Sequence, residues 1–125
     1  MNQWTLQGKK AIVTGGTKGI GKAIVDEMVN LGADLIAVAR DLGLADRNPK
    51  AQYLEGDITD ATFRQQLLYT AGQRWGMLHI LVNNVGTNVR KKFTEYAEEE
   101  YRKLFETNLF AMTALTQAAH ELLVK

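Results

Sequence analysis

Apolar residues fall into short runs that are separated by segments with helical spacing. The segment KAIVTG (10–15) is rich in β-forming residues and ends in a turn signal. The segments DLIAVAR (34–40) and LHILVNN (78–84) indicate parallel strands buried on both faces, because a half-exposed strand would alternate. A weaker strand is predicted at AQYLEGD (51–57).

Helical spacing predicts three helices between and after these strands. The first begins near Ile20 and ends at Gly32. The second has Thr59 or Asp60 as its N-cap and stops at Gly76. The third is a long helix capped by Thr94. Its predicted apolar stripe comprises Tyr101, Leu104, Phe105, Met112, Leu115, Ala119 and Leu122.

Strands joined through helices predict an α/β fold with an open, doubly wound parallel sheet of about four strands. The segment 41–50 contains the only proline and is expected to be a loop, or at most one helical turn. In such sheets, ligands bind outside the carboxyl ends of the strands, where the strand order reverses. The segment 14–21 lies at one of these ends.

Composition removes several kinds of chemistry. The 125 residues include neither cysteine nor serine, so disulfides, cysteine-ligated metals and serine nucleophiles are excluded. His79 and His120 have no second ligand at metal spacing, and no metal site is predicted. A net charge of +1 gives no general reason to bind nucleic acid. No apolar run is long enough for a membrane helix, so we expect a soluble protein in the cytoplasm.

The stretch TGGTKGIG (14–21) places glycines between a predicted strand and a predicted helix. A tight turn needs a residue free of Cβ strain, and a pyrophosphate can approach the backbone only where no side chain intervenes. The following helix offers unpaired N–H groups and a partial positive charge to an anion. A dinucleotide is therefore the predicted ligand, and a turn that is merely close-packed is the alternative.

The spacing T-G-x-x-x-G-x-G at 14–21 resembles that of the short-chain dehydrogenase/reductase family. Three further motifs lie in the family's order: GDI at 56–58, NNVG at 83–86 and TNL at 107–109. The run NNVGTNVRKKFTEY is most similar to the tropinone-reductase-like branch. The resemblance covers the whole chain and implies one Rossmann-type domain over 1–125, with strand order 3-2-1-4.

The resemblance also implies roles for individual residues. In the glycine turn, the residues expected to hold the pyrophosphate and the adenosine ribose are Gly15, Thr17, Lys18, Gly19, Ile20 and Gly21. Asp57 and Ile58 would meet the adenine. Asn84 and Gly86 would end the fourth strand near the ribose, whereas Asn83 has either a ligand role or a structural one. Asn108 matches the helix asparagine that holds a water in the family's proton relay.

The end of the second strand bears on the choice between NAD and NADP. A carboxylate there accepts from a ribose 2′-OH, whereas a nearby arginine accommodates a 2′-phosphate. Here Ala39 is followed by Arg40, and Lys18 could reach the same phosphate. NADP is therefore predicted over NAD, although Asp41 could instead neutralise Arg40.

The chain departs from the family pattern in its catalytic residues. Family members are about twice as long and supply a serine and a Tyr-x-x-x-Lys pair after the asparagine helix; this chain ends at Lys125 without them. One interpretation is the cofactor-binding half of an NADP-dependent oxidoreductase, whether a fragment, a truncated product or an engineered piece. The alternative is a stand-alone nucleotide-binding or interaction module without enzymatic activity. An in-frame continuation past Lys125 would distinguish them.

The last predicted helix also predicts self-association. Besides its core stripe, it carries Phe110, Ala111, Ala114 and Ala118 on another side. In the family this surface commonly pairs helices between subunits. The fourth strand, which is interior in the family, is expected to have an open apolar edge in this chain. We therefore expect a homo-oligomer with contacts along 98–123.

Overall fold

Strands and helices alternate along the residues that the computed structural model describes, which are 4–43, 46–86 and 90–125. The strands are β1 (Lys10–Thr14), β2 (Asp34–Ala39), β3 (Gln52–Glu55) and β4 (Ile80–Val82). The helices are α1 (Gly19–Asn30), α2 (Ala61–Trp75), the 3-10 turn η1 (Phe93–Glu95), α3 (Glu98–Phe105), the π-helical turn η2 (Glu106–Phe110) and α4 (Ala111–Leu123).

The four strands form one parallel sheet in the order β3-β2-β1-β4. In the central register, Ala11 of β1 lies opposite Leu35 of β2 and Ile80 of β4. This order confirms the predicted fold class. Between β2 and β3 the described residues contain no helix, which agrees with the loop expected over 41–50.

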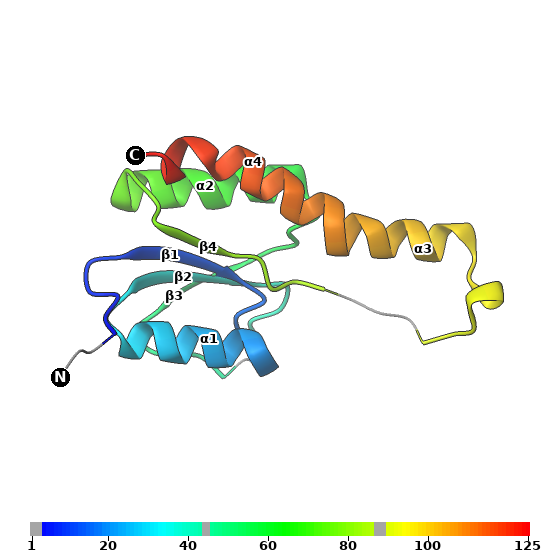
Figure 1. Ribbon diagram of the computed structural model, residues 1–125, viewed down its shortest axis with the longest axis horizontal. Coiled ribbons are helices and arrows are strands. Elements are labelled where there is room, and N and C mark those ends of the chain that lie inside the picture. Colours follow the sequence, from blue (N-terminus) through cyan, green and yellow to red (C-terminus); the bar gives the residue numbers. More distant parts are fainter. Residues whose placement is uncertain (1–3, 44–45, 87–89) are drawn as a thin grey trace.

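Helices cover both faces of the sheet (Figure 1). Helix α1 lies on one face, and α2 and α4 lie side by side on the other. Strand β1 contributes side chains to the core on both faces of the sheet. Ala11 and Val13 belong to the apolar cluster with α1, whereas Ile12 belongs to the cluster with α2 and α4. The continuous apolar runs of β1 and β2 follow from this burial on both sides. None of the described helices is long and apolar enough to cross a bilayer.

Strand β4 is an edge strand of the sheet and is less buried than the sequence predicts. In the described part of the chain it pairs only with β1, and Ile80, Leu81 and Val82 are each half-buried, in contrast to the buried strands β1 and β2. Its outer backbone groups therefore form an open edge, as the sequence predicts.

Helix α2 has the ends predicted from its sequence. The Asp60 side chain accepts a hydrogen bond from the Thr62 backbone N–H, so Asp60 is the N-cap. Gly76 ends the helix with a left-handed φ of 71°, which favours glycine. Phe63 and Leu67 of this helix are buried.

The predicted start of the last helix is wrong. Thr94 lies in η1, and α3 begins only at Glu98 after Ala97. The Ala97 N–H donates to Oε1 of Glu100 at 3.0 Å, and three glutamates occupy the first turn. These carboxylates favour a helix start at this point because they complement the positive end of the helix dipole.

The predicted apolar stripe of that helix is wrong in its first half. Leu115 and Ala119 are buried, but Tyr101, Phe105 and Met112 are exposed. The π-helical turn η2 holds about one more residue per turn than an α-helix, so the positions before it are rotated relative to those after it. Moreover, α3 extends beyond the end of the sheet, where no core lies beneath it (Figure 1).

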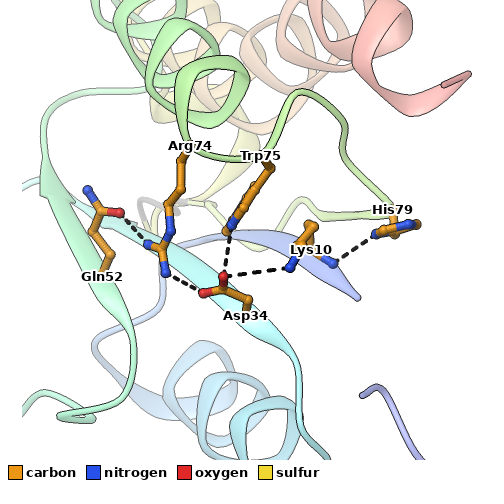
Figure 2. A network of polar contacts seen from close by, with 6 residues as sticks. All are labelled: Lys10, Asp34, Gln52, Arg74, Trp75 and His79. Atoms are coloured by element: carbon orange, nitrogen blue, oxygen red, sulfur yellow. Dashed lines mark hydrogen bonds and ion pairs between the residues drawn. The ribbon is translucent and has the colours of Figure 1, made fainter. Parts of the chain in front are cut away.

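A polar network joins the end of α2 to the starts of β2 and β3 (Figure 2). The Asp34 carboxylate accepts hydrogen bonds from the Arg74 guanidinium and from Nε1 of Trp75, the latter at 2.9 Å. Arg74 also donates to Gln52, and its guanidinium lies 5.1 Å from the centre of the Trp75 ring. The network therefore holds the amino ends of two strands against one helix.

The amino end of β1 is linked to the start of β4 through His79. The Lys10 N–H donates to Nδ1 of His79 at 2.9 Å, and the His79 N–H donates to the Lys10 carbonyl at 2.9 Å (Figure 2). Lys10 Nζ lies 3.9 Å from Asp34. The amino ends of all four strands are thus linked by side-chain contacts.

Replacing Asp34 should therefore destabilise the fold. Asp34→Ala removes the acceptor of two charge-assisted hydrogen bonds, and we expect the free energy of unfolding to fall by about 1–2 kcal/mol, reduced from the buried value by partial exposure. Urea unfolding followed by circular dichroism measures this. Asp46→Ala is the control, since Asp46 is exposed and makes one long ion pair with Lys22. Equal stability of the two variants would contradict the network's contribution.

Candidate cofactor-binding site

The glycine turn leaves β1 and leads directly into α1. Gly15 has a left-handed φ of 69°, and the N–H groups of Gly15 and Gly16 donate to the Val38 carbonyl of β2 at 2.8 and 3.2 Å. Gly19, at φ 51°, is the first residue of α1. The unpaired N–H groups of the first helical turn therefore lie at the carboxyl end of β1.

Two of the glycines are required by close packing within the protein. A Cβ on Gly21 would lie 1.8 Å from the Gly15 carbonyl oxygen, and one on Gly15 would lie 2.9 Å from the Asn84 carbonyl oxygen. Asn84 in turn donates from its backbone N–H to the Thr14 hydroxyl at 2.9 Å and from its side chain to the Gly15 carbonyl at 3.3 Å. Asn84 thus braces the glycine turn against the end of β4.

A cleft of about 680 Å³ lies at the carboxyl ends of the strands. The predicted site residues that line it are Gly15, Thr17, Lys18, Arg40, Asp57, Ile58, Asn84 and Gly86. Three others do not line it: Gly19, the exposed Ile20 and the buried Gly21. Asn83 is also outside and donates to the Thr116 hydroxyl of α4 at 3.1 Å, which is a structural contact.

Asn108 lies beside the cleft without lining it. It belongs to the π-helical turn η2, and a Cβ on Gly86 would come 3.5 Å from its Oδ1. The structure therefore brings the TNL motif next to the NNVG motif, although Thr107 follows Gly86 by 21 positions in the sequence. Such π turns are frequent at functional sites.

Asp57 is held ionised at the end of β3. Its Oδ1 accepts from the backbone N–H of Thr59 at 2.9 Å and from the Thr59 hydroxyl at 2.7 Å. These two bonds, followed by the positive charges of Arg40 and Lys103, lower the pKa of the carboxyl, and partial burial opposes them. Both bonds use Oδ1, so Oδ2 retains lone pairs for a donor such as an exocyclic amine.

The cations that the sequence singled out lie in the cleft wall. Arg40 follows β2 and Lys18 precedes α1, and both side chains are exposed. The Asp41 carboxylate accepts from the Gly43 N–H at 2.8 Å and makes no ion pair with Arg40 in the described structure. The guanidinium is therefore not neutralised by its neighbour.

Sequence reasoning missed one wall of the cleft. Lys103, Glu106 and Thr107 line it from α3 and η2, opposite the glycine turn. Their i, i+3, i+4 spacing places them on one helical face, but no motif includes the first two. Among the described residues, no cluster of histidine, aspartate and glutamate could hold a metal ion.

The cleft suits a dinucleotide by its chemistry. Backbone N–H groups of the glycine turn stand at the end of β1, and cations and an ionised carboxylate stand where strands β2 and β3 finish. A pyrophosphate fits the first set, and an adenosine fits the second.

Several curated relatives of this chain are tropinone reductase homologues. The chain is 43% identical to a tropinone reductase homologue of Arabidopsis thaliana, across 97% of this chain and 49% of the relative. It is 42% identical to an Arabidopsis homologue described as chloroplastic, across 97% and 40%, and 36% identical to a tropinone reductase homologue of Datura stramonium, across 97% and 48%. The chain thus spans about half the length of these relatives.

A solved structure and a family model point the same way. The ligand-free aldohexose dehydrogenase of Thermoplasma acidophilum matches with a TM-score of 0.85 and 28% identity, over 95% of this chain and 46% of that one. The family model described as short chain dehydrogenase matches residues 9–125. The chain therefore belongs to the short-chain dehydrogenase family.

Proposed function

We propose that this chain forms the NADP(H)-binding part of a short-chain dehydrogenase/reductase that interconverts carbonyls and alcohols. The observation that carries the proposal is the cleft at the carboxyl ends of the strands, where the glycine turn, Arg40 and Asp57 meet. NADP supplies the hydride chemistry when bound. The residues of this chain bind and orient the nucleotide.

Each group has a distinct task in this proposal. The first turn of α1 holds the pyrophosphate, Asp57 accepts from the adenine amine, and Ile58, which is buried, packs beneath the ring. Arg40 and Lys18 bind the 2′-phosphate. Asn84 acts indirectly, because its hydrogen bonds hold the glycine turn in place.

The cytoplasmic location stays a prediction. One relative is described as chloroplastic.

Arg40→Ala tests the cofactor assignment. Loss of the guanidinium should weaken NADP binding by about 1.5–3 kcal/mol and leave NAD binding nearly unchanged, because only NADP carries the 2′-phosphate. Titration calorimetry with both nucleotides measures this. Arg102→Ala is the matched control, since Arg102 pairs with Glu98 away from the cleft. An unmutated protein that binds NAD and NADP equally would contradict the assignment.

The chain on its own should be catalytically silent. The family's serine and Tyr-x-x-x-Lys pair are missing, and no tyrosine has a lysine four residues later: the tyrosines are Tyr53, Tyr69, Tyr96 and Tyr101. The given sequence therefore lacks the groups with which the family protonates the carbonyl oxygen. We therefore expect no ketone-dependent NADPH oxidation above background, in samples whose NADPH binding is confirmed by fluorescence. Turnover of about one per second that Asn108→Ala abolishes would show that another proton donor exists.

An exposed apolar face on the last helices supports self-association. Of the pairing surface predicted from the sequence, Ala111 is instead buried in the core, whereas Phe110 is exposed. The exposed apolar residues, which we call the outer face, are Tyr101, Phe105, Leu109, Phe110 and Met112, each between 39 and 55% exposed. Apolar residues gathered on one side of a helix favour contact with another protein surface. A twofold pairing of this face between two copies is the simplest closed arrangement.

Phe105→Glu should therefore shift the protein toward monomer. At micromolar concentration we expect the unmutated chain to be a homodimer or larger, and the introduced charge to disrupt the outer face. Size-exclusion chromatography with light scattering measures the mass. Trp4→Glu, at an equally apolar but distant position that is 89% exposed, is the control. An unmutated protein that stays at 13.9 kDa at high concentration would refute self-association.

A further inference from the structure

One charged residue in the cleft has no role in the family motifs. Lys103 lies near the end of α3 and shares a helical face with Glu106 and Thr107, which line the cleft with it. Its neighbour Arg102 points elsewhere and lies 3.5 Å from Glu98 one turn earlier. Two adjacent cations of α3 therefore face different surroundings.

Lys103 and Arg40 both line the cleft. Both cations act on the Asp57 carboxylate and lower its pKa, after the stronger effect of the two hydrogen bonds from Thr59. Both cations and the Asp57 carboxylate line the same cleft. Arg40 comes from the end of β2 and Lys103 from α3, so the two charges approach from different walls.

The ammonium of Lys103 is not committed to a protein partner. Within residues 4–43, 46–86 and 90–125, no carboxylate lies within 4.0 Å of it and no hydrogen bond is formed. In contrast, the nearby Lys91 is bound to Glu100 at 2.6 Å. Lys103 therefore keeps three donors and a full charge for a ligand.

Carboxylates in the cleft wall favour a further cation beside Arg40 and Lys18. Asp41, Asp57 and Glu106 also line the cleft and repel an anionic ligand. These three negative charges reduce the attraction that Arg40 and Lys18 exert on a phosphate dianion. A cation on the opposite wall would offset this repulsion.

We propose that Lys103 is a specificity residue that binds the 2′-phosphate of the dinucleotide from the wall opposite Arg40. The phosphate is then held between β2 and α3. The proposal deepens the proposed function and rests on it. The proposal gives α3 two roles: it contributes to the outer face, and it favours binding of the phosphorylated dinucleotide.

The test compares four proteins against two nucleotides. The proteins are the unmutated chain, Lys103→Ala, Lys103→Arg and the control Arg102→Ala, which removes the same charge one residue away. NADP and NAD both carry the pyrophosphate and differ only in the 2′-phosphate. Titration calorimetry gives Kd for each pair, and thermal melting checks that every variant is folded.

We expect Lys103→Ala to raise Kd for NADP about three- to tenfold and to leave Kd for NAD unchanged. Lys103→Arg should retain NADP binding, and Arg102→Ala should match the unmutated chain. The difference between Lys103→Ala and the unmutated chain should shrink when salt rises from about 0.05 to about 0.3 M, because this exposed charge is screened.

Three results overturn the proposal in distinguishable ways. Equal losses for NADP and NAD would place Lys103 at the pyrophosphate. Identical Kd values for Lys103→Ala and Arg102→Ala would show that its position has no effect, while the proposed function stands. An unmutated chain that binds neither nucleotide would overturn the proposed function itself, and this assignment with it.

Discussion

The contact between the ends of β1 and β4 is the constraint on which the site depends. Thr14 donates from its hydroxyl to the Val82 carbonyl and accepts from the Asn84 N–H, so one side chain joins both strands. Asn84 then reaches the Gly15 carbonyl, and only glycine fits at 15 and 21 in this arrangement. The first turn of α1, whose N–H groups we propose bind the pyrophosphate, follows directly after this contact. The glycine motif is thus a packing requirement first, and the space it leaves for a pyrophosphate is a consequence.

The amino and carboxyl ends of the strands differ in how their polar groups are paired. At the amino ends, Asp34, Arg74 and Trp75 satisfy one another, and His79 completes the pairing of Lys10 (Figure 2). At the carboxyl ends, cations and carboxylates line a cleft and remain exposed to solvent. The amino ends therefore carry a polar network that links the strands to one another, whereas the groups that are available for a ligand lie at the carboxyl ends. Such a division suits open α/β sheets, whose ligands bind at the carboxyl ends.

Local patterns predicted the sheet and α2 well because each signal there has a local cause. Continuous apolar runs reflect burial on both faces, and Asp60 and Gly76 act on the backbone within one turn. The last helix could not be predicted in the same way. Its π-helical turn shifts the periodicity, and its start is set by the first-turn glutamates rather than by Thr94. The strand order followed from the resemblance, whereas residues of the α3 wall such as Lys103 needed the tertiary structure, because no local motif marks them.

The π-helical turn explains how one long segment serves two surfaces. After the turn, Leu115 and Ala119 of α4 face the core beside α2. Before it, α3 has no buried residue and extends past the sheet, with Lys103 toward the cleft and Phe105 on the outer face. An uninterrupted α-helix would continue the core-facing stripe into a region without a core. The extra residue in η2 rotates α3 relative to α4, so that a polar face reaches the cleft while an apolar face stays exposed. This exposure is costly for an isolated chain unless another surface covers it.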